Sequence, residues 1–290
     1  SAVESVESMR NRLLDQDLDY KNLVKTNLPN AMGMIGGLEN IRERVKQYAI
    51  LNKIVINPQP HYSAVTKSVR LYAKGASFQC LSRDIRKSFF SGKRQFDLKH
   101  AQLVIISKLW DAPEILSYFG SKSVWSTLMS ETKLDKDSIK RGVYTLIFGG
   151  SYANAVMNMA EVSEMPLWKV KDCMARCKFF KVLENASRRF SAKIKADKSV
   201  KDAFGRELVD KDKLSAKDIR SIKGLQAQSY EVAIMIPVIE HLLDKGFNCW
   251  LFLHDGFISD DSSYMLYQEL KAIAEYAGKQ FGMVMSLDME

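Results

Sequence analysis

Apolar residues recur at helical spacing along most of this chain, and strand-like runs are few. The spacing predicts helices in four stretches: residues 5–55, 111–190, 214–245 and 263–281. The first stretch is expected to hold two or three helices, broken by the turn NLPN and by Gly36 and Gly37. The second should break at Gly149 and Gly150, and the third should hold two helices. Most of the fold is therefore expected to be helical.

Three segments carry a strand pattern instead. RQFDLKHAQLVIISKLW reads as a strand that runs into a helix, and MVMSLD closes the chain as a further strand. In CWLFLHDGFISDD, two apolar runs flank Asp255 and Gly256, which is typical of a tight hairpin. The predicted class is α+β, an antiparallel sheet core with a large helical insertion between its strands.

Composition bounds the kind of protein. The chain has 290 residues, of which 46% are hydrophobic and 27% charged, enough for one large domain or two closely joined ones. No run of eighteen apolar residues occurs, so no membrane partner is expected. The first residues lack the apolar core of an export signal, which favours a cytoplasmic location.

Positive charge points to a polyanionic partner. The formal net charge is +9, and nucleic-acid affinity depends mainly on neutralising phosphates. One basic run lies within twelve residues just before Asp97 and consists of Arg83, Arg86, Lys87, Lys93 and Arg94. Another spans residues 193–201.

Two aspartates stand at predicted strand ends. Alone, Asp255 reads as turn chemistry and Asp97 as the N-cap of a helix. The strands around Asp255 are unusually apolar, however, and a carboxylate at the edge of a core needs a cation or a hydrogen-bonded partner. Both aspartates could converge on a pair of Mg²⁺ ions, as phosphoryl-transfer sites do, with Mn²⁺ as a substitute.

A helical stripe adds cations and aromatic rings. Lys136, Lys140, Tyr144 and Phe148 recur every four residues, and successive members drift by about 40° around a helix. Two cations followed by two rings suit a triphosphate, a sugar and a base. The plainer interpretation is a solvated lysine pair beside two core aromatics.

Six motifs together resemble family A DNA polymerases, the bacterial DNA polymerase I type, which is related to phage-type single-subunit RNA polymerases. The resemblance runs from about residue 68 to 262, in the family's order. The motifs are SVRLYAKGASFQCLSRDIRKSFF, RQFDLKHAQL, KDSIKRGVYTLIFGG, AFGREL, LQAQSYEVA and LFLHDGFI.

The resemblance implies a right-hand polymerase fold with an antiparallel palm sheet, a large helical fingers insertion and a reduced thumb. The implied segments are 1–65 (N-terminal helical region and reduced thumb), 66–110 (first part of the palm), 111–222 (fingers) and 223–290 (second part of the palm). It also implies DNA primer-template and nucleoside triphosphates as partners, and a protein partner in place of a thumb or exonuclease domain. By analogy, the setting would be the nucleoid or a phage-infected bacterial cell.

The resemblance also implies roles for single residues. Asp97 and Asp255 would be catalytic metal ligands, joined by Leu98 in the metal site. Lys136 and Lys140 would hold the incoming triphosphate, Lys140 would protonate the leaving pyrophosphate, and Tyr144, Phe148 and Gln102 would contact the nucleotide. The implied nucleic-acid contacts are Arg70, Gln79, Arg83, Arg86, Lys87, Gln226 and His254.

Departures from the family pattern leave the sugar preference open. Gln102 stands where the DNA enzymes carry a Glu that excludes a ribose 2′-hydroxyl, and Gly256 replaces the acidic residue after the His-Asp pair. The first hypothesis is a DNA polymerase that extends a primer 3′-hydroxyl by a two-metal mechanism, without a proofreading domain. A single-subunit RNA polymerase or primer-synthesising enzyme is the second. A catalytically silent palm subunit that binds nucleic acid is the third.

Overall fold

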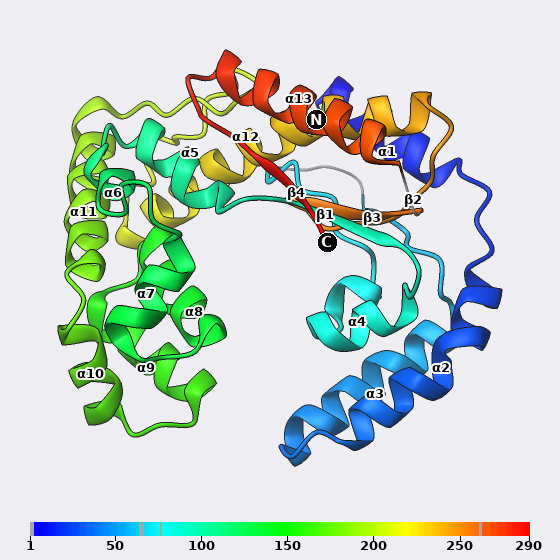
Figure 1. Ribbon diagram of the computed structural model, residues 1–290. Coiled ribbons are helices and arrows are strands. Elements are labelled where there is room, and N and C mark those ends of the chain that lie inside the picture. Colours follow the sequence, from blue (N-terminus) through cyan, green and yellow to red (C-terminus); the bar gives the residue numbers. More distant parts are fainter. Residues whose placement is uncertain (1–2, 64–66, 76, 261–262) are drawn as a thin grey trace. The chain divides into compact units, whose positions relative to one another are not determined.

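A computed structural model describes residues 3–63, 67–75, 77–260 and 263–290 (Figure 1). The chain divides into two compact units. Unit 1 comprises Ser1–Lys99, Val232–Phe281 and Met285–Glu290, and unit 2 comprises His100–Glu231 and Gly282–Val284. Among the described residues, no helix is both long enough and apolar enough to cross a membrane.

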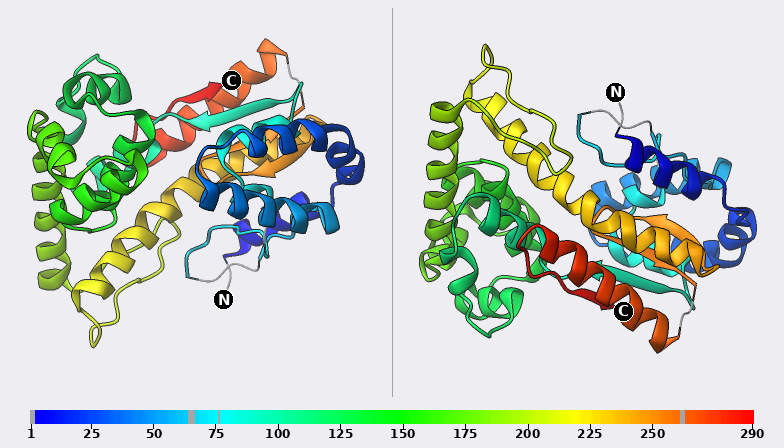
Figure 2. Two further views of the ribbon diagram at one scale, coloured as in Figure 1. Left: turned by 90° about the horizontal axis from the view of Figure 1, so that it is seen from below. Right: turned by 90° about the horizontal axis from the view of Figure 1, so that it is seen from above.

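Unit 1 contains a small sheet and the helices around it. Its elements are α1 (Glu4–Leu14), α2 (Tyr20–Gly36), α3 (Ile41–Ile56), the 3-10 turn η1 (Phe78–Cys80), α4 (Arg83–Phe89), β1 (Arg94–Leu98), β2 (Cys249–Phe252), β3 (Gly256–Ser259), α13 (Tyr264–Gln280) and β4 (Leu287–Met289). It also holds the second part of α12 (Ala216–Asp244). Figure 1 and Figure 2 show α2 and α3 side by side.

The sheet is antiparallel, with the strand order β2-β3-β1-β4. β1 is therefore central, although it lies far from β3 and β4 in the sequence. Successive side chains of a strand point to opposite faces, so Gln95 and Asp97 share one face of β1 and Phe96 lies on the other. This alternation separates the polar side chains of β1 from its apolar ones.

Each face of the sheet packs on its own helices. On the apolar side, Phe96 stacks on Phe257 with ring centroids 4.9 Å apart, and Tyr267 of α13 lies 6.3 Å from Phe96. On the other side, Ile258 belongs to a core cluster that includes buried residues of α2, α3 and α4. Figure 1 shows α13 and α4 on opposite faces of the sheet. Because apolar side chains are buried on both faces of the sheet, β1 is held in place together with its polar residues Gln95 and Asp97.

Unit 2 is helical in its described part. Its elements are α5 (Ala101–Leu109), α6 (Glu114–Ser117), α7 (Val124–Thr132), α8 (Lys136–Ile147), α9 (Tyr152–Ser163), α10 (Leu167–Ala175), α11 (Phe179–Asp197) and the first part of α12. α8 and α9 pack closely at Gly142, where a Cβ atom would lie 2.2 Å from Sδ of Met159. The hairpin expected around Gly205 is present as a bridge between Lys201 and Glu207.

A buried lysine joins α12 to α11 within unit 2. Lys223 is 2% exposed, and its Nζ donates hydrogen bonds to the Ser187 carbonyl oxygen (3.1 Å), to Ser187 Oγ (2.5 Å) and to Ser191 Oγ (3.1 Å). The ammonium also lies 4.8 Å from the centre of the Trp110 ring. Burial lowers its pKa from 10.5 to about 8.

Three sequence expectations about elements were wrong. The NLPN segment lies inside α2, with Pro29 within the helix, and residues 216–244 form one helix that includes Pro237. Proline weakens a helix locally, but buried side chains on the same helix outweigh that cost through packing. The last strand is β4 rather than the whole of MVMSLD.

Candidate active site

An acidic pocket of about 250 Å³ lies in unit 1 beside the polar face of β1. Asp97 reaches it from the strand, and Asp255 reaches it from the turn between β2 and β3. The residues that line it are Gln79, Arg86, Gln95, Asp97, Leu253, His254 and Asp255. Two carboxylates that are distant in the sequence thus share one cavity.

Main-chain pairing brings these two aspartates together. Asp97 pairs with Gly256 in the β1–β3 ladder, and the Leu98 amide donates a 2.7 Å hydrogen bond to the Asp255 carbonyl oxygen. The Leu253 amide bonds to the Gly256 carbonyl oxygen at 2.8 Å and closes the turn. His254 lies at its tip with a φ of 69°. The tip is therefore His254 and Asp255, one residue earlier than the sequence predicts.

Position 256 needs a glycine because there is no room for a side chain, and not because the turn needs an unusual backbone angle there. A Cβ atom at this position would lie 2.3 Å from Oδ1 of Asp97 and 2.3 Å from the Phe96 carbonyl oxygen. No side chain fits there while Asp97 keeps its place. An acidic side chain at position 256 would therefore displace Asp97 or the Phe96 main chain.

The Asp97 carboxylate is neither exposed nor a helix cap. It lies within β1, whereas His100 precedes α5 as its N-cap. Gln95 Nε2 donates hydrogen bonds to both carboxylate oxygens, at 3.1 and 3.0 Å. Burial raises the pKa of Asp97, and the Gln95 hydrogen bonds oppose that rise. The capping interpretation of Asp97 is therefore wrong.

Arg86 supplies positive charge to the same pocket. Burial lowers the pKa of this guanidinium, while the nearby Asp97 and Asp255 act to raise it. Its Nε is buried without a hydrogen-bond partner among the described residues. A cation that is only partly satisfied by the protein suits an additional anionic ligand.

The donor set of this pocket fits a magnesium site in part. Mg²⁺ in phosphoryl-transfer sites is usually bound by one or two carboxylates together with substrate phosphates, and Asp97 and Asp255 provide two. No cluster of three His, Cys, Asp or Glu side chains suited to a metal occurs in the described part of the chain. The Leu98 side chain is buried and apolar, so only its main-chain oxygen could be a ligand.

Two other predicted contacts border the acidic pocket. The Gln79 amide accepts from the Ala73 amide (2.9 Å) and donates to the Phe252 carbonyl oxygen (2.7 Å), so it joins the main chain of two segments. Burial and the nearby Arg70 lower the pKa of His254 to about 3. The His254 imidazole is consequently neutral at physiological pH.

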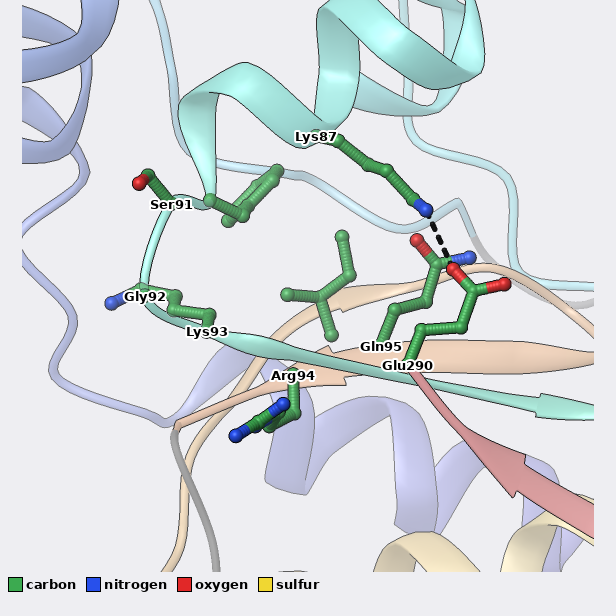
Figure 3. A pocket seen from close by; sticks show the side chains of 9 residues that line it. Lys87, Ser91, Gly92, Lys93, Arg94, Gln95 and Glu290 are labelled. Carbon is green, nitrogen blue, oxygen red and sulfur yellow. Dashed lines mark hydrogen bonds and ion pairs between the residues drawn. The ribbon is translucent and has the colours of Figure 1, made fainter.

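A second cavity of about 310 Å³ lies next to the first, and Gln95 lines both. Figure 3 shows Lys87 reaching Glu290 there; the distance from Nζ to Oε2 is 2.6 Å. Arg83 pairs with the other oxygen of the same carboxylate. Burial acts to raise the pKa of Glu290, but together the contacts with Arg83 and Lys87 outweigh it and lower this pKa to about 2. Two of the cations predicted to bind nucleic acid are thus held by one carboxylate.

The helical stripe lies along α8 in unit 2. Lys136 is exposed, and Lys140, Tyr144 and Phe148 are partly exposed, with Phe148 as the C-cap residue. The Tyr144 and Phe148 rings are stacked, with centroids 6.4 Å apart. Trp125 of α7 extends this surface, because its ring lies 5.3 Å from Lys140 Nζ and 6.4 Å from the Tyr144 ring. The stripe is therefore a cation-aromatic surface and not a core face.

Gln102 and Phe148 both contact α12 within unit 2. Gln102 Nε2 donates a 2.7 Å hydrogen bond to Oε2 of Glu231, and both side chains are buried. A Cβ atom at Gly224 would lie 3.4 Å from the Phe148 ring, about two helical turns before Glu231. Gln226 is also buried and donates to the Lys201 carbonyl oxygen at 3.0 Å. A carboxylate thus stands beside Gln102, although position 102 itself has none.

The sequence interpretation missed three residues that complete these surfaces. They are Gln95, which holds Asp97, Trp125, which borders Lys140, and Glu231, which binds Gln102. Gln95 carried a usable signal, because it lies two residues from Asp97 in a predicted strand and so shares its face. The other two lie on separate helices, where one sequence gives no pairing signal.

Comparisons with known proteins find a similar fold among solved structures but no relative by sequence. No protein-family model matches the chain, and no curated protein matches it. The fold is similar to a solved structure described as the POL domain of Pol1 from M. smegmatis in complex with DNA primer-template and dNTP, with a TM-score of 0.61 at 12% sequence identity. The match covers 99% of this chain and 62% of that one. The protein therefore has a mixed fold, helical with a small antiparallel sheet, similar to a DNA polymerase I polymerase domain.

Proposed function

We propose that this protein is a template-directed nucleotidyltransferase that extends a primer 3′-hydroxyl with deoxynucleotides. One observation carries the proposal: Asp97 and Asp255 line a single pocket in a fold similar to a polymerase domain. Primer-template DNA and nucleoside triphosphates are the proposed partners, as in that solved complex.

The right-hand arrangement belongs to the same proposal. Residues 66–110 and 223–290 would act as the palm, because they hold the antiparallel sheet and both aspartates. Residues 111–222 would act as the fingers, because they hold α8 and its stripe. The helices α1 to α3 would serve as a reduced thumb.

The proposed mechanism gives each group of side chains its own task. Asp97 and Asp255 would hold two Mg²⁺ ions, which when bound supply activation of the primer hydroxyl and neutralisation of the triphosphate. Lys136 and Lys140 would bind the triphosphate, and Lys140 would donate a proton to the departing pyrophosphate. Tyr144 and Phe148 would pack on the incoming nucleotide, while pairing with the template selects its base. Arg70, Gln79, Arg86, Gln226 and His254 would contact the primer-template.

One primer-extension assay tests this function. The purified protein is given dNTPs or rNTPs with Mg²⁺, on a primed template and on the same template without primer. We expect primer-dependent extension with dNTPs. Primer binding without incorporation of any nucleotide contradicts the proposal and leaves a catalytically silent binding subunit.

A polymerase that uses ribonucleotides is the second candidate, favoured by Gln102 in place of Glu. Gln102 is neutral, but it is held by the Glu231 carboxylate at 2.7 Å. If this pair excludes a 2′-hydroxyl, Gln102→Ala should raise rNTP use relative to dNTP use by about tenfold, since a lost steric contact is typically worth 1–3 kcal/mol. An unchanged ratio of the two kcat/KM values shows that position 102 is not the sugar gate.

A further inference from the structure

Gln95 is a buried amide that is satisfied at only one of its two ends. Gln95 is 8% exposed, and its Nε2 donates hydrogen bonds to both carboxylate oxygens of Asp97. Its Oε1 is buried and has no hydrogen-bond partner among the described residues. A buried acceptor without a partner typically costs about 1–3 kcal/mol, so this end of the amide suits a ligand.

The position of Gln95 links it to the acidic pocket and to Glu290. It lines the pocket that holds Asp97 and Asp255, and it also lines the neighbouring cavity. The Glu290 amide donates a 2.8 Å hydrogen bond to the Gln95 carbonyl oxygen, so the two residues face each other across β1 and β4. Figure 3 shows both side chains on the same side of the sheet.

We propose that Gln95 is the third oxygen donor of the metal site, so that a divalent cation is held by Asp97, Asp255 and the Gln95 amide oxygen. The inference rests on the proposed function, because it assumes a cation between the two aspartates. A half-turn of the amide exchanges its two ends, so that Oε1 takes the place beside Asp97 that Nε2 now occupies. The terminal torsion of Gln is broad and roughly two-fold, so this rotation meets little intrinsic resistance.

The chemistry of the pocket favours an amide as the additional donor. Amide oxygens are hard ligands that divalent cations accept alongside carboxylates. A third carboxylate cannot come from position 256, where a Cβ atom would meet Asp97 Oδ1 at 2.3 Å. Position 95 shares the face of Asp97 and needs no such space. The amide adds an oxygen without adding negative charge to a buried site.

Calorimetric titration of Mn²⁺ into the full chain, without nucleotide, tests this assignment. The variant Gln95→Leu removes both ends of the amide. We expect its Mn²⁺ affinity to fall by about tenfold, in line with the loss of a group that orients or completes a metal site. If Gln95 only holds Asp97, its N–H groups compete with the cation, and Gln95→Leu binds Mn²⁺ equally well or more tightly. That result overturns the inference.

Two controls separate this inference from the proposed function. Asp97→Asn and Asp255→Asn should each weaken Mn²⁺ binding. If neither does, the metal site of the proposed function is wrong, whereas weakening in both with none in Gln95→Leu contradicts only the assignment of Gln95.

A measurement on the unmodified protein covers the case in which Gln95→Leu fails to fold. The side-chain amide signals of Gln95 are followed by ¹⁵N–¹H spectroscopy and assigned by their loss in Gln95→Glu. They should shift on addition of Mg²⁺, because Nε2 leaves the Asp97 carboxylate. Unchanged signals at saturating Mg²⁺ overturn the inference.

Discussion

The acidic pocket of unit 1 and the α8 stripe of unit 2 position their side chains in different ways. The pocket joins Asp97 and Asp255 through strand pairing, so its geometry depends on the main chain of β1 and β3. The stripe takes three members from α8 and the fourth, Phe148, from the C-cap position directly after it, so helical repeat places most of its side chains. The pocket should therefore be sensitive to small changes in the backbone, and the stripe only to changes of its own side chains.

The largest expected effect comes from the two aspartates of the pocket. Asp97→Asn or Asp255→Asn should lower turnover in primer extension by at least about 10³-fold, which corresponds to about 4 kcal/mol of transition-state stabilisation. Primer-template affinity should change little, because the basic segments provide it. Single-turnover extension and a separate DNA-binding titration measure the two quantities. Retained turnover in either variant removes the two-metal assignment.

The stripe should respond through one cation. Lys140→Ala should lower turnover by about 10²-fold, the loss typical of one group that stabilises developing charge. Arg141→Ala is the matched control, because Arg141 is its exposed neighbour on α8 and lies outside the four-residue repeat. Equal losses in the two variants, measured by single-turnover extension, would show that the stripe acts only through its general positive charge.

Adding one methyl group at position 256 should show most clearly that the pocket, unlike the stripe, depends on the exact position of the backbone. Gly256→Ala places a Cβ atom against Asp97 and Phe96, and overpacking of this kind typically costs about 1–3 kcal/mol. Urea denaturation should show that loss of stability, together with lost turnover. Gly33→Ala is the control, since nothing lies within 4 Å of its Cβ position inside α2 and alanine favours a helix. Wild-type stability of Gly256→Ala contradicts the steric explanation.

The smallest effect concerns pH and again differs between the units. The folded-state pKa of Lys223 in unit 2, about 8, lies below its ordinary value of 10.5. The unfolded chain therefore binds more protons between these values, and the free energy of unfolding should rise with pH by at most about 1.4 kcal/mol per pH unit. Lys223→Met should flatten that slope in urea denaturation.

In unit 1 the same reasoning applies at acidic pH. The folded-state pKa of His254, about 3, lies below 6.5, so protonation of the unfolded chain destabilises the fold as pH falls from 6.5 toward 3. His254→Gln should retain stability better over that window. A slope identical to that of the unmodified protein would show that His254 is not the responsible group.

The sequence predicts the helices and the hairpin well because both have local periodic signals. β1 with α5, the β2–β3 hairpin and α13 follow the expected ranges closely. The two proline-containing helices were mispredicted, because burial decides whether a proline is tolerated and burial is not a local property. The division into four segments and the assigned functions of the site residues stay predictions.

The site was predictable only where residues share an element. The α8 stripe follows directly from spacing, and the structure adds Trp125 from another helix. The meeting of Asp97 with Asp255 was raised by their places at predicted strand ends and favoured by the resemblance, since one sequence does not give the register of β1 against β3. The Gln102–Glu231 bond and the Arg83–Glu290 pair are long-range contacts of the same kind.

The lack of room beside Gly256 limits how this pocket can change by mutation. An acidic side chain introduced at position 256 would displace the Asp97 carboxylate. The gain of one carboxylate and the displacement of the other therefore cannot be tested or selected independently. Libraries that seek a third carboxylate should vary positions 95, 97 and 256 together. A library that varies position 256 alone would yield only variants in which the new side chain conflicts with Asp97.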